Sequence, residues 1–135
     1  MNKKVIIGSV VGGVVAFFLG WVIFGMLLSG FYKANMTVYE GLMIDPPNLV
    51  GIAIGNLMWC VLLAVLFNKM GIADLVQGAI WGGLTFFLVM GGMDLFFWAS
   101  MNLYSPMGLA VDVVANTCFG AIMGAVIAFV MSKIS

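Results

Sequence analysis

The sequence contains no histidine, and its five basic residues are all lysines. Without histidine the chain lacks the commonest general base and the commonest metal ligand of proteins. Without arginine, and with five lysines balanced by five acidic residues, it also lacks a basic patch that could hold nucleic acid. These absences exclude nucleic acid as a partner and argue against an enzyme.

Charge of either sign is scarce, because only 7% of the residues are charged while 64% are hydrophobic and the mean hydropathy is +1.23. Such a composition cannot cover a water-exposed surface. Cys60 and Cys118 each lie in the middle of an apolar run, which is typical of small hydrophobic side chains and not of redox or zinc centres. We therefore expect an all-α membrane protein without a cofactor.

Apolar runs long enough to cross a bilayer as helices, for which about 20 residues suffice, occur four times. The first run exceeds the apolar region of a secretory signal (about 7 to 15 residues) and has no small-x-small cleavage site after it, which favours an uncleaved anchor. Short connections make the later runs antiparallel neighbours. The sequence predicts a single integral-membrane domain over residues 1–135, an antiparallel four-transmembrane-helix bundle with spans at 5–30, 48–67, 75–100 and 109–131.

Small residues recur at spacings of four, which places them in rows on helix faces and lets another backbone approach closely. The rows are Gly8, Gly12, Ala16 and Gly20 in the first span, Gly51 and Gly55 in the second, Gly78 and Gly82 in the third, and Gly120 and Gly124 in the fourth. We expect these GxxxG-type rows to be packing faces.

The longest polar connection, residues 31–47, separates the first two spans. Its aromatic residues Phe31, Tyr32 and Tyr39 are of the kind that anchors a chain at the headgroup boundary. We expect this segment to anchor the chain and not to act as a binding lid.

Lysines set the expected orientation, since cytoplasmic loops of membrane proteins carry an excess of them. With the N-terminus inside, only Lys33 lies outside, and the cytoplasmic side holds Lys3, Lys4, Lys69 and Lys133. The sequence therefore predicts that both termini are cytoplasmic.

Polar side chains inside the spans are few. Burying an ionised side chain costs several kcal/mol, so such residues are candidates for a functional site. This threading places four of them roughly 5 to 13 Å below the outer surface at 1.5 Å per residue, namely Asn56, Asp94, Asp112 and Asn116. The inner half holds little beside Gln77 and Thr85. The pattern predicts an outward-facing ligand or ion site over an apolar floor.

Two alternatives remain open for this region. Asp94 and Asp112 could be helix-end carboxylates that reach interfacial water or pair with Lys33. A thioether site for Cu(I) could form from Met90, Met93, Met101 and Met107. The spread of 12 methionines over all four spans instead favours flexible gap-filling.

Families of similar size offer a comparison. Small multidrug-resistance transporters carry an essential carboxylate in the first span, which this chain lacks, and fluoride channels carry an arginine, which it also lacks. The segment Gly20-Trp21-Val22-Ile23-Phe24-Gly25, followed by Phe31-Tyr32, resembles the first span of an uncharacterised family of small four-helix bacterial integral membrane proteins. The resemblance implies a multi-pass protein of the bacterial cytoplasmic (inner) membrane.

Together these patterns favour a membrane protein that binds a small solute, cation or proton at the outward-facing site, such as a transporter or transporter subunit. The competing hypothesis is a non-catalytic accessory or assembly subunit of a larger membrane complex. An intramembrane enzyme ranks third, because no nucleophile is placed beside a base. The expected partners are the lipid bilayer and either a second copy or a larger membrane protein.

The orientation can be tested with reporter fusions. A fusion after Ser135 should report the cytoplasm, and one within residues 33–45 should report the outside, because the lysine bias sets the threading. The reverse pattern would place the polar side chains near the cytoplasmic surface and contradict an outward-facing site.

Overall fold

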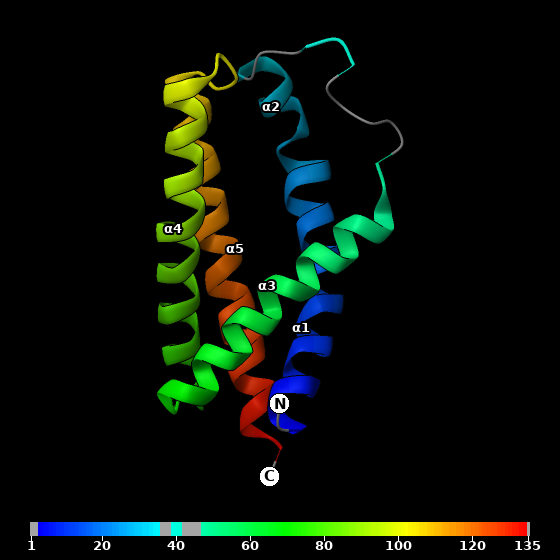
Figure 1. Ribbon diagram of the computed structural model, residues 1–135, viewed down its shortest axis with the longest axis vertical. Helices are drawn as coiled ribbons and strands as arrows, with labels where there is room; N and C mark the ends of the chain where they lie inside the picture. The colour runs from blue at the N-terminus through cyan, green and yellow to red at the C-terminus, as the bar shows by residue number, and fades with distance from the viewer. Residues whose placement is uncertain (1–2, 36–38, 42–46, 135) are drawn as a thin grey trace.

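The computed structural model describes residues 3–35, 39–41 and 47–134. Most helices follow one long axis, α3 crosses obliquely, and both chain ends lie at the same end of the molecule (Figure 1). In chain order the helices are α1 (Lys3–Gly20), the π-helix η1 (Trp21–Leu27), α2 (Ser29–Asn35), α3 (Leu49–Met70), α4 (Leu75–Ser100) and α5 (Pro106–Ser132).

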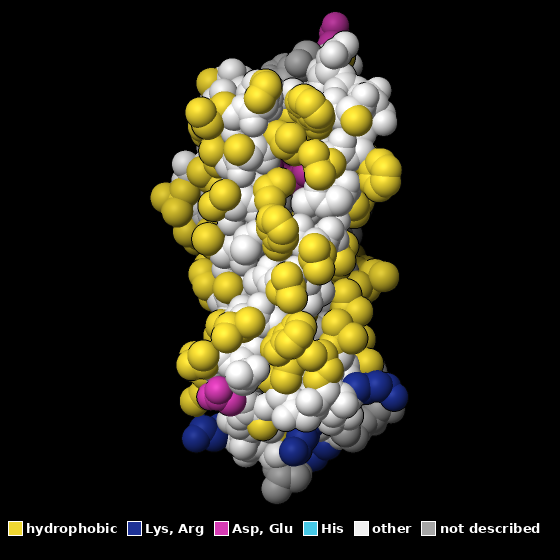
Figure 2. Space-filling model, turned by 90° about the vertical axis from the view of Figure 1, so that its left-hand side faces the viewer, with side chains coloured by type: hydrophobic (Ala, Val, Ile, Leu, Met, Phe, Trp, Pro, Cys, Tyr) yellow, Lys and Arg dark blue, Asp and Glu magenta, His cyan; other side chains and the backbone are white. Residues whose placement is uncertain are grey.

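Among the described residues, four stretches are long and apolar enough to span a membrane: α1 together with η1, α3, α4 and α5. Figure 2 shows hydrophobic side chains spread over the middle of one face, with lysines confined to one end. An apolar surface of this kind is suited to contact with lipid. For the described residues, the prediction of an all-helical chain with four helices long and apolar enough to span a membrane is confirmed.

The sequence fixes where three helices begin. The side chains of Asn48, Asp74 and Ser105 accept hydrogen bonds from backbone N–H groups in the first turns of α3, α4 and α5. Such caps satisfy N–H groups that have no partner within the helix. At the other end of α3, Gly71 adopts a left-handed conformation with φ of 72°, which favours glycine and turns the chain into α4.

The first predicted span is not one regular α-helix. In η1 the backbone widens, and the N–H of Leu28 donates to the carbonyl of Ile23, five residues earlier, at 3.0 Å. Gly25 suits this turn because a Cβ there would lie 2.8 Å from Cδ1 of Trp21. The α-helix predicted over residues 5–30 therefore ends at Gly20. After η1 the chain becomes α-helical again as α2.

The segment predicted as an outer loop, residues 31–47, differs from the expectation at its start. Residues 31–35 belong to α2. Within the rest of the segment, residues 36–38 and 42–46 lie outside the described residues.

The most extensive packing joins α4 and α5. Gly78 and Gly82 face Gly120 and Gly124, and a Cβ on Gly82 would lie 2.8 Å from Cα of Gly124 and closer still to the carbonyl oxygen of Gly120. The two backbones can approach this far only because these side chains are absent. The contact fixes how α4 and α5 are aligned along their lengths.

The small-residue row of α1 lies against α5. A Cβ on Gly8 would lie 2.8 Å from Cγ of Met131, and one on Gly12 would lie 2.8 Å from Cγ1 of Ile127. Ala16 is also buried. Helix α3 packs mainly on α1 and adds Leu63 and other apolar side chains to the core.

Replacing a close-packed glycine should be costly. Gly82→Ala should lower the free energy of unfolding in detergent by about 1 to 3 kcal/mol, because its Cβ would collide with the α5 backbone. Thermal unfolding of the purified protein is the measurement.

The matched control is Gly55→Ala, since Gly55 also ends a GxxxG pair but a Cβ there meets nothing within 4 Å. That variant should be neutral or more stable by up to about 1 kcal/mol, because alanine favours helix. Equal losses in the two variants would contradict the proposed role of the α4–α5 contact.

Candidate functional site

Two carboxyl groups meet at the end of the molecule opposite the chain termini. Asp94 lies in the last two turns of α4 and Asp112 in the second turn of α5, and the close contact between these helices brings them together. Their side chains interact with each other. Asp94 is 3% exposed and Asp112 is 9% exposed, so both are withdrawn from the surface.

Asp112 is held by donors on both of its carboxyl oxygens. The hydroxyl of Tyr32 donates to Oδ1 at 2.6 Å, and Nδ2 of Asn116 donates to Oδ2 at 3.1 Å. The same Asn116 amide also donates to the backbone carbonyl of Asp112 at 2.9 Å, which fixes its orientation. Asp112 is therefore positioned by one residue of its own helix and one from α2.

Asp94 is satisfied differently. Its Oδ2 atom is buried and has no hydrogen-bond partner among the described residues. Its side chain is hydrogen-bonded to that of Tyr104, which lies in the turn between α4 and α5. Burial, followed by the nearby carboxyl groups of Asp112 and Asp94, raises the pKa of Tyr104 to about 12. Tyr104 therefore stays a neutral hydroxyl beside the pair.

Helix α2 covers the pair because it is fastened to the α4–α5 turn. The N–H of Ser105 donates to the carbonyl of Asn35 at 3.0 Å, and the Ser105 hydroxyl donates to Oδ1 of Asn35 at 3.4 Å. The hydroxyl of Tyr39 donates to the carbonyl of Asn102 at 2.7 Å. The two bonds between Ser105 and Asn35 keep Tyr32 over Asp112, so α2 covers the site.

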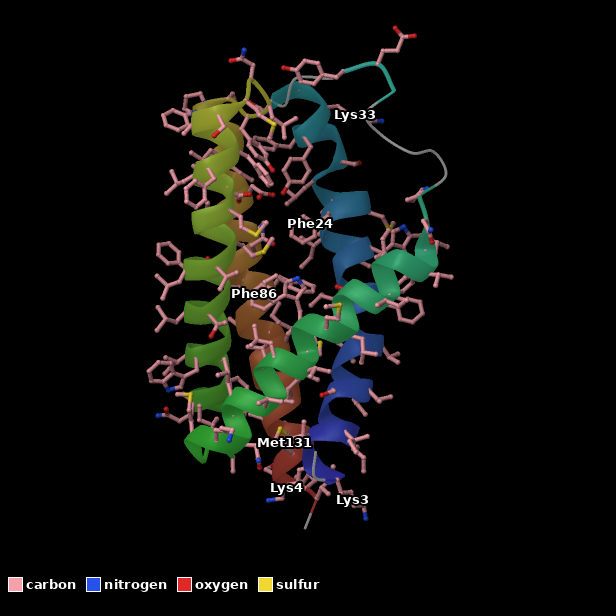
Figure 3. All side chains as sticks on the ribbon, in the orientation of Figure 1. Lys3, Lys4, Phe24, Lys33, Phe86 and Met131 are labelled. Carbon is pink, nitrogen blue, oxygen red and sulfur yellow. The ribbon has the colours of Figure 1, made fainter. Side chains whose placement is uncertain are left out.

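Below the pair, aromatic rings form a continuous apolar layer across the molecule. The Tyr32 ring stacks on Phe24 with centroids 6.3 Å apart, and Phe24 contacts Phe119 at 6.1 Å. Phe119 contacts Phe86 at 5.6 Å, and Phe86 contacts Trp59 of α3 at 5.2 Å. Phe24 and Phe86 lie in the middle part of the long axis, between α4 on one side and α1 with η1 on the other (Figure 3). The polar site therefore stands over an apolar floor.

Three of the four predicted site residues come together: Asp94, Asp112 and Asn116. The fourth, Asn56, is half-buried on α3, which packs mainly on α1, and it makes no hydrogen bond to these three within the described ranges. Within the described residues, Lys33 forms no ion pair with either carboxyl group. The two carboxyl groups thus lack a basic partner among the described residues.

Sequence reasoning missed Tyr32 and Tyr104 as parts of the site. Tyr32 was expected to be an interfacial anchor, and Tyr104 is one residue of a short turn. The available signal was that each hydroxyl-bearing ring lies next to the end of a predicted span, at the same end of the bundle as both aspartates.

Metal chemistry finds little support here. The described residues contain no cluster of three or more histidine, cysteine, aspartate or glutamate side chains that could hold a metal ion. The methionines considered as Cu(I) ligands diverge, since Met93, Met101 and Met107 are exposed while Met90 packs against the core.

No protein-family model, curated protein or solved structure matches the chain. The resemblance of its first span to a bacterial family stays a prediction.

Tyr32→Phe should remove the only hydroxyl that bonds Asp112 from another helix of the described chain. Because hydrogen bonds to charged groups contribute about 1.5 to 3 kcal/mol, we expect a loss of stability of about that size in detergent. Tyr39→Phe is the control, since its hydroxyl bonds a neutral carbonyl at an exposed position and should contribute about 1 kcal/mol or less. If Tyr39→Phe lost as much stability as Tyr32→Phe, the Tyr32–Asp112 bond would contribute no more than an ordinary exposed hydrogen bond, which would contradict the prediction.

Proposed function

We propose that this chain is a multi-pass protein of the bacterial cytoplasmic membrane that binds a small cationic solute, a cation or a proton at the Asp94–Asp112 site, as a transporter or a transporter subunit. Its four long helices form an antiparallel bundle in a single integral-membrane domain. Both termini are cytoplasmic, and the site faces outward.

The position of the lysines supports this orientation. Lys3 and Lys4 lie at one end of the molecule and Lys33 at the other (Figure 3). The C-terminal ends of α3 and α5, which carry Lys69 and Lys133, lie at the same end as Lys3 and Lys4 (Figure 1). By the excess of lysine on cytoplasmic sides, the end that holds the carboxyl pair faces outward.

The single observation that carries the proposal is the buried carboxyl pair without a basic partner in the described chain. Two ionised carboxylates in contact and away from water repel each other and lose hydration. A proton or a bound cation removes this penalty. Ionisable groups that persist inside a membrane domain characteristically mark the binding or passage of ions.

The apolar floor supports a binding site and not an open pore. Trp59, Phe86, Phe119 and Phe24 fill the level beneath the pair with contacting rings. A continuous water path through this layer would need those rings to separate. Binding from one side is therefore the simplest use of the site.

A carboxyl-region infrared difference experiment on the reconstituted protein tests the proposal. When the external pH is changed, or a cation is added at constant pH, the wild-type protein should give a carboxyl difference band. The band should be absent in the Asp94→Asn/Asp112→Asn double variant, because the amides cannot take up a proton or an ionic charge. A double variant that gives the wild-type spectrum would refute binding at this pair.

The accessory-subunit hypothesis is favoured by one feature. A groove of about 430 Å³ opens between α1 and α3, and it is lined by apolar side chains that include Phe17, Phe18 and Leu57. A helix of a larger partner could pack there. Purification from native membranes separates the two functions, because a subunit should bring a stoichiometric partner and a transporter should run alone or as a homo-oligomer.

A further inference from the structure

We infer that the two carboxyl groups have different roles: Asp94 carries an exchangeable proton, and Asp112 is the fixed ionised partner that positions it. This inference rests on the proposed function and narrows its ligand to a proton. In each cycle a hydronium ion on the outer side gives a proton to the Asp94 carboxylate and leaves water, and the reverse step releases it.

Each of the two Asp112 carboxyl oxygens accepts a hydrogen bond from a neutral donor, one from Tyr32 and the other from Asn116. Donors aimed at both oxygens stabilise the ionised form of a carboxyl group. The Tyr32 bond is 2.6 Å long. Hydroxyls that donate to ionised oxygens fall at about 2.5 to 2.7 Å, so the geometry fits a charged Asp112.

Asp94 has a different environment, in which Asp112 and the Tyr104 hydroxyl are the polar groups that act on its side chain. Its Oδ2 is buried without a partner among the described residues, and an ionised oxygen left in that state is strongly disfavoured. If Asp94 is protonated, it can donate to Asp112, with whose side chain it is hydrogen-bonded. The remaining oxygen is then a neutral carbonyl, which tolerates a missing partner much better. One proton on Asp94 therefore satisfies both side chains.

The same contacts argue against a metal ion as the ligand. Calcium takes about six to eight oxygen ligands, and magnesium requires six in near-octahedral positions. Both oxygens of Asp112 are already occupied by donors, and no third acidic side chain joins the pair in the described part of the chain. Oδ2 of Asp94 is the one carboxyl oxygen of the pair without a partner in the described chain, and one ligand is too few for these ions. A proton needs only the contact between the two carboxyl groups.

Single variants in reconstituted vesicles test the assignment by infrared spectroscopy in H2O and D2O. The wild-type protein should show a protonated-carboxyl band that shifts in D2O and disappears when the external pH is raised. Asp94→Asn should abolish the band, whereas Asp112→Asn should retain it. Ser132→Ala, whose hydroxyl bonds the carbonyl of Phe129 at the far end of α5, should leave the band unchanged.

Each other outcome has a definite meaning. A band lost in Asp112→Asn and kept in Asp94→Asn would overturn the assignment and leave the proposed function intact. Removal of the band by Na⁺, K⁺, Mg²⁺ or Ca²⁺ at constant pH would overturn the proton and support a metal cation. A wild-type protein with no carboxyl response to pH or to any of these ions would overturn both proposals.

If Asp94→Asn does not fold, glutamate variants answer the same question. Asp94→Glu keeps a carboxyl group but moves it by one methylene, so the frequency of the protonated band should change. Asp112→Glu should leave that frequency much nearer the wild-type value. The opposite pattern would assign the proton to Asp112.

Discussion

The structure depends on the contact between α4 and α5 at Gly78, Gly82, Gly120 and Gly124. In a membrane the lipid is as apolar as the side chains, so helices associate by close packing and not by the hydrophobic effect. Bare backbones provide that packing here, and they fix the register of the two helices. Asp94 lies three turns beyond Gly82 on α4, and this register places it beside Asp112 of α5. The glycine contact, which is the least polar part of the α4–α5 interface, thus positions the two carboxyl groups, which are its most polar part.

The second constraint is the cost of burying charge, which explains why the first span is irregular. The widened turn of η1 ends the α-helix at Gly20, and the chain then turns at Leu28 into α2. This break places Tyr32 over Asp112, where its hydroxyl donates a hydrogen bond to the buried carboxyl group. Wide turns of this kind occur often at functional sites. The wide turn of η1 thus permits the hydrogen bond between Tyr32 and Asp112.

Local signals in the sequence predicted much of this. The bounds of α4 coincide with the third predicted span because apolar length, the capping Asp74 and the following polar turn all act within a few residues. Asp94 and Asp112 were predicted to meet because the turn between their helices is short. Asn56 and Tyr32 could not be placed in this way. The oblique course of α3 and the wide turn of η1 depend on packing between distant segments, which no local pattern encodes.

The two barriers around the carboxyl pair are unequal, and this inequality bears on what the site can do. Outward, α2 is fastened by a few hydrogen bonds at Ser105 and Asn35, each of which water can replace at little cost. Inward, contacting rings such as Phe86 and Phe119 and the glycine contact must all separate before water can pass. Opening the outer cover is therefore much easier than opening the floor. Under the proposed function, a ligand would therefore exchange through the α2 side, and its passage to the other end of the molecule would require α4 and α5 to move apart.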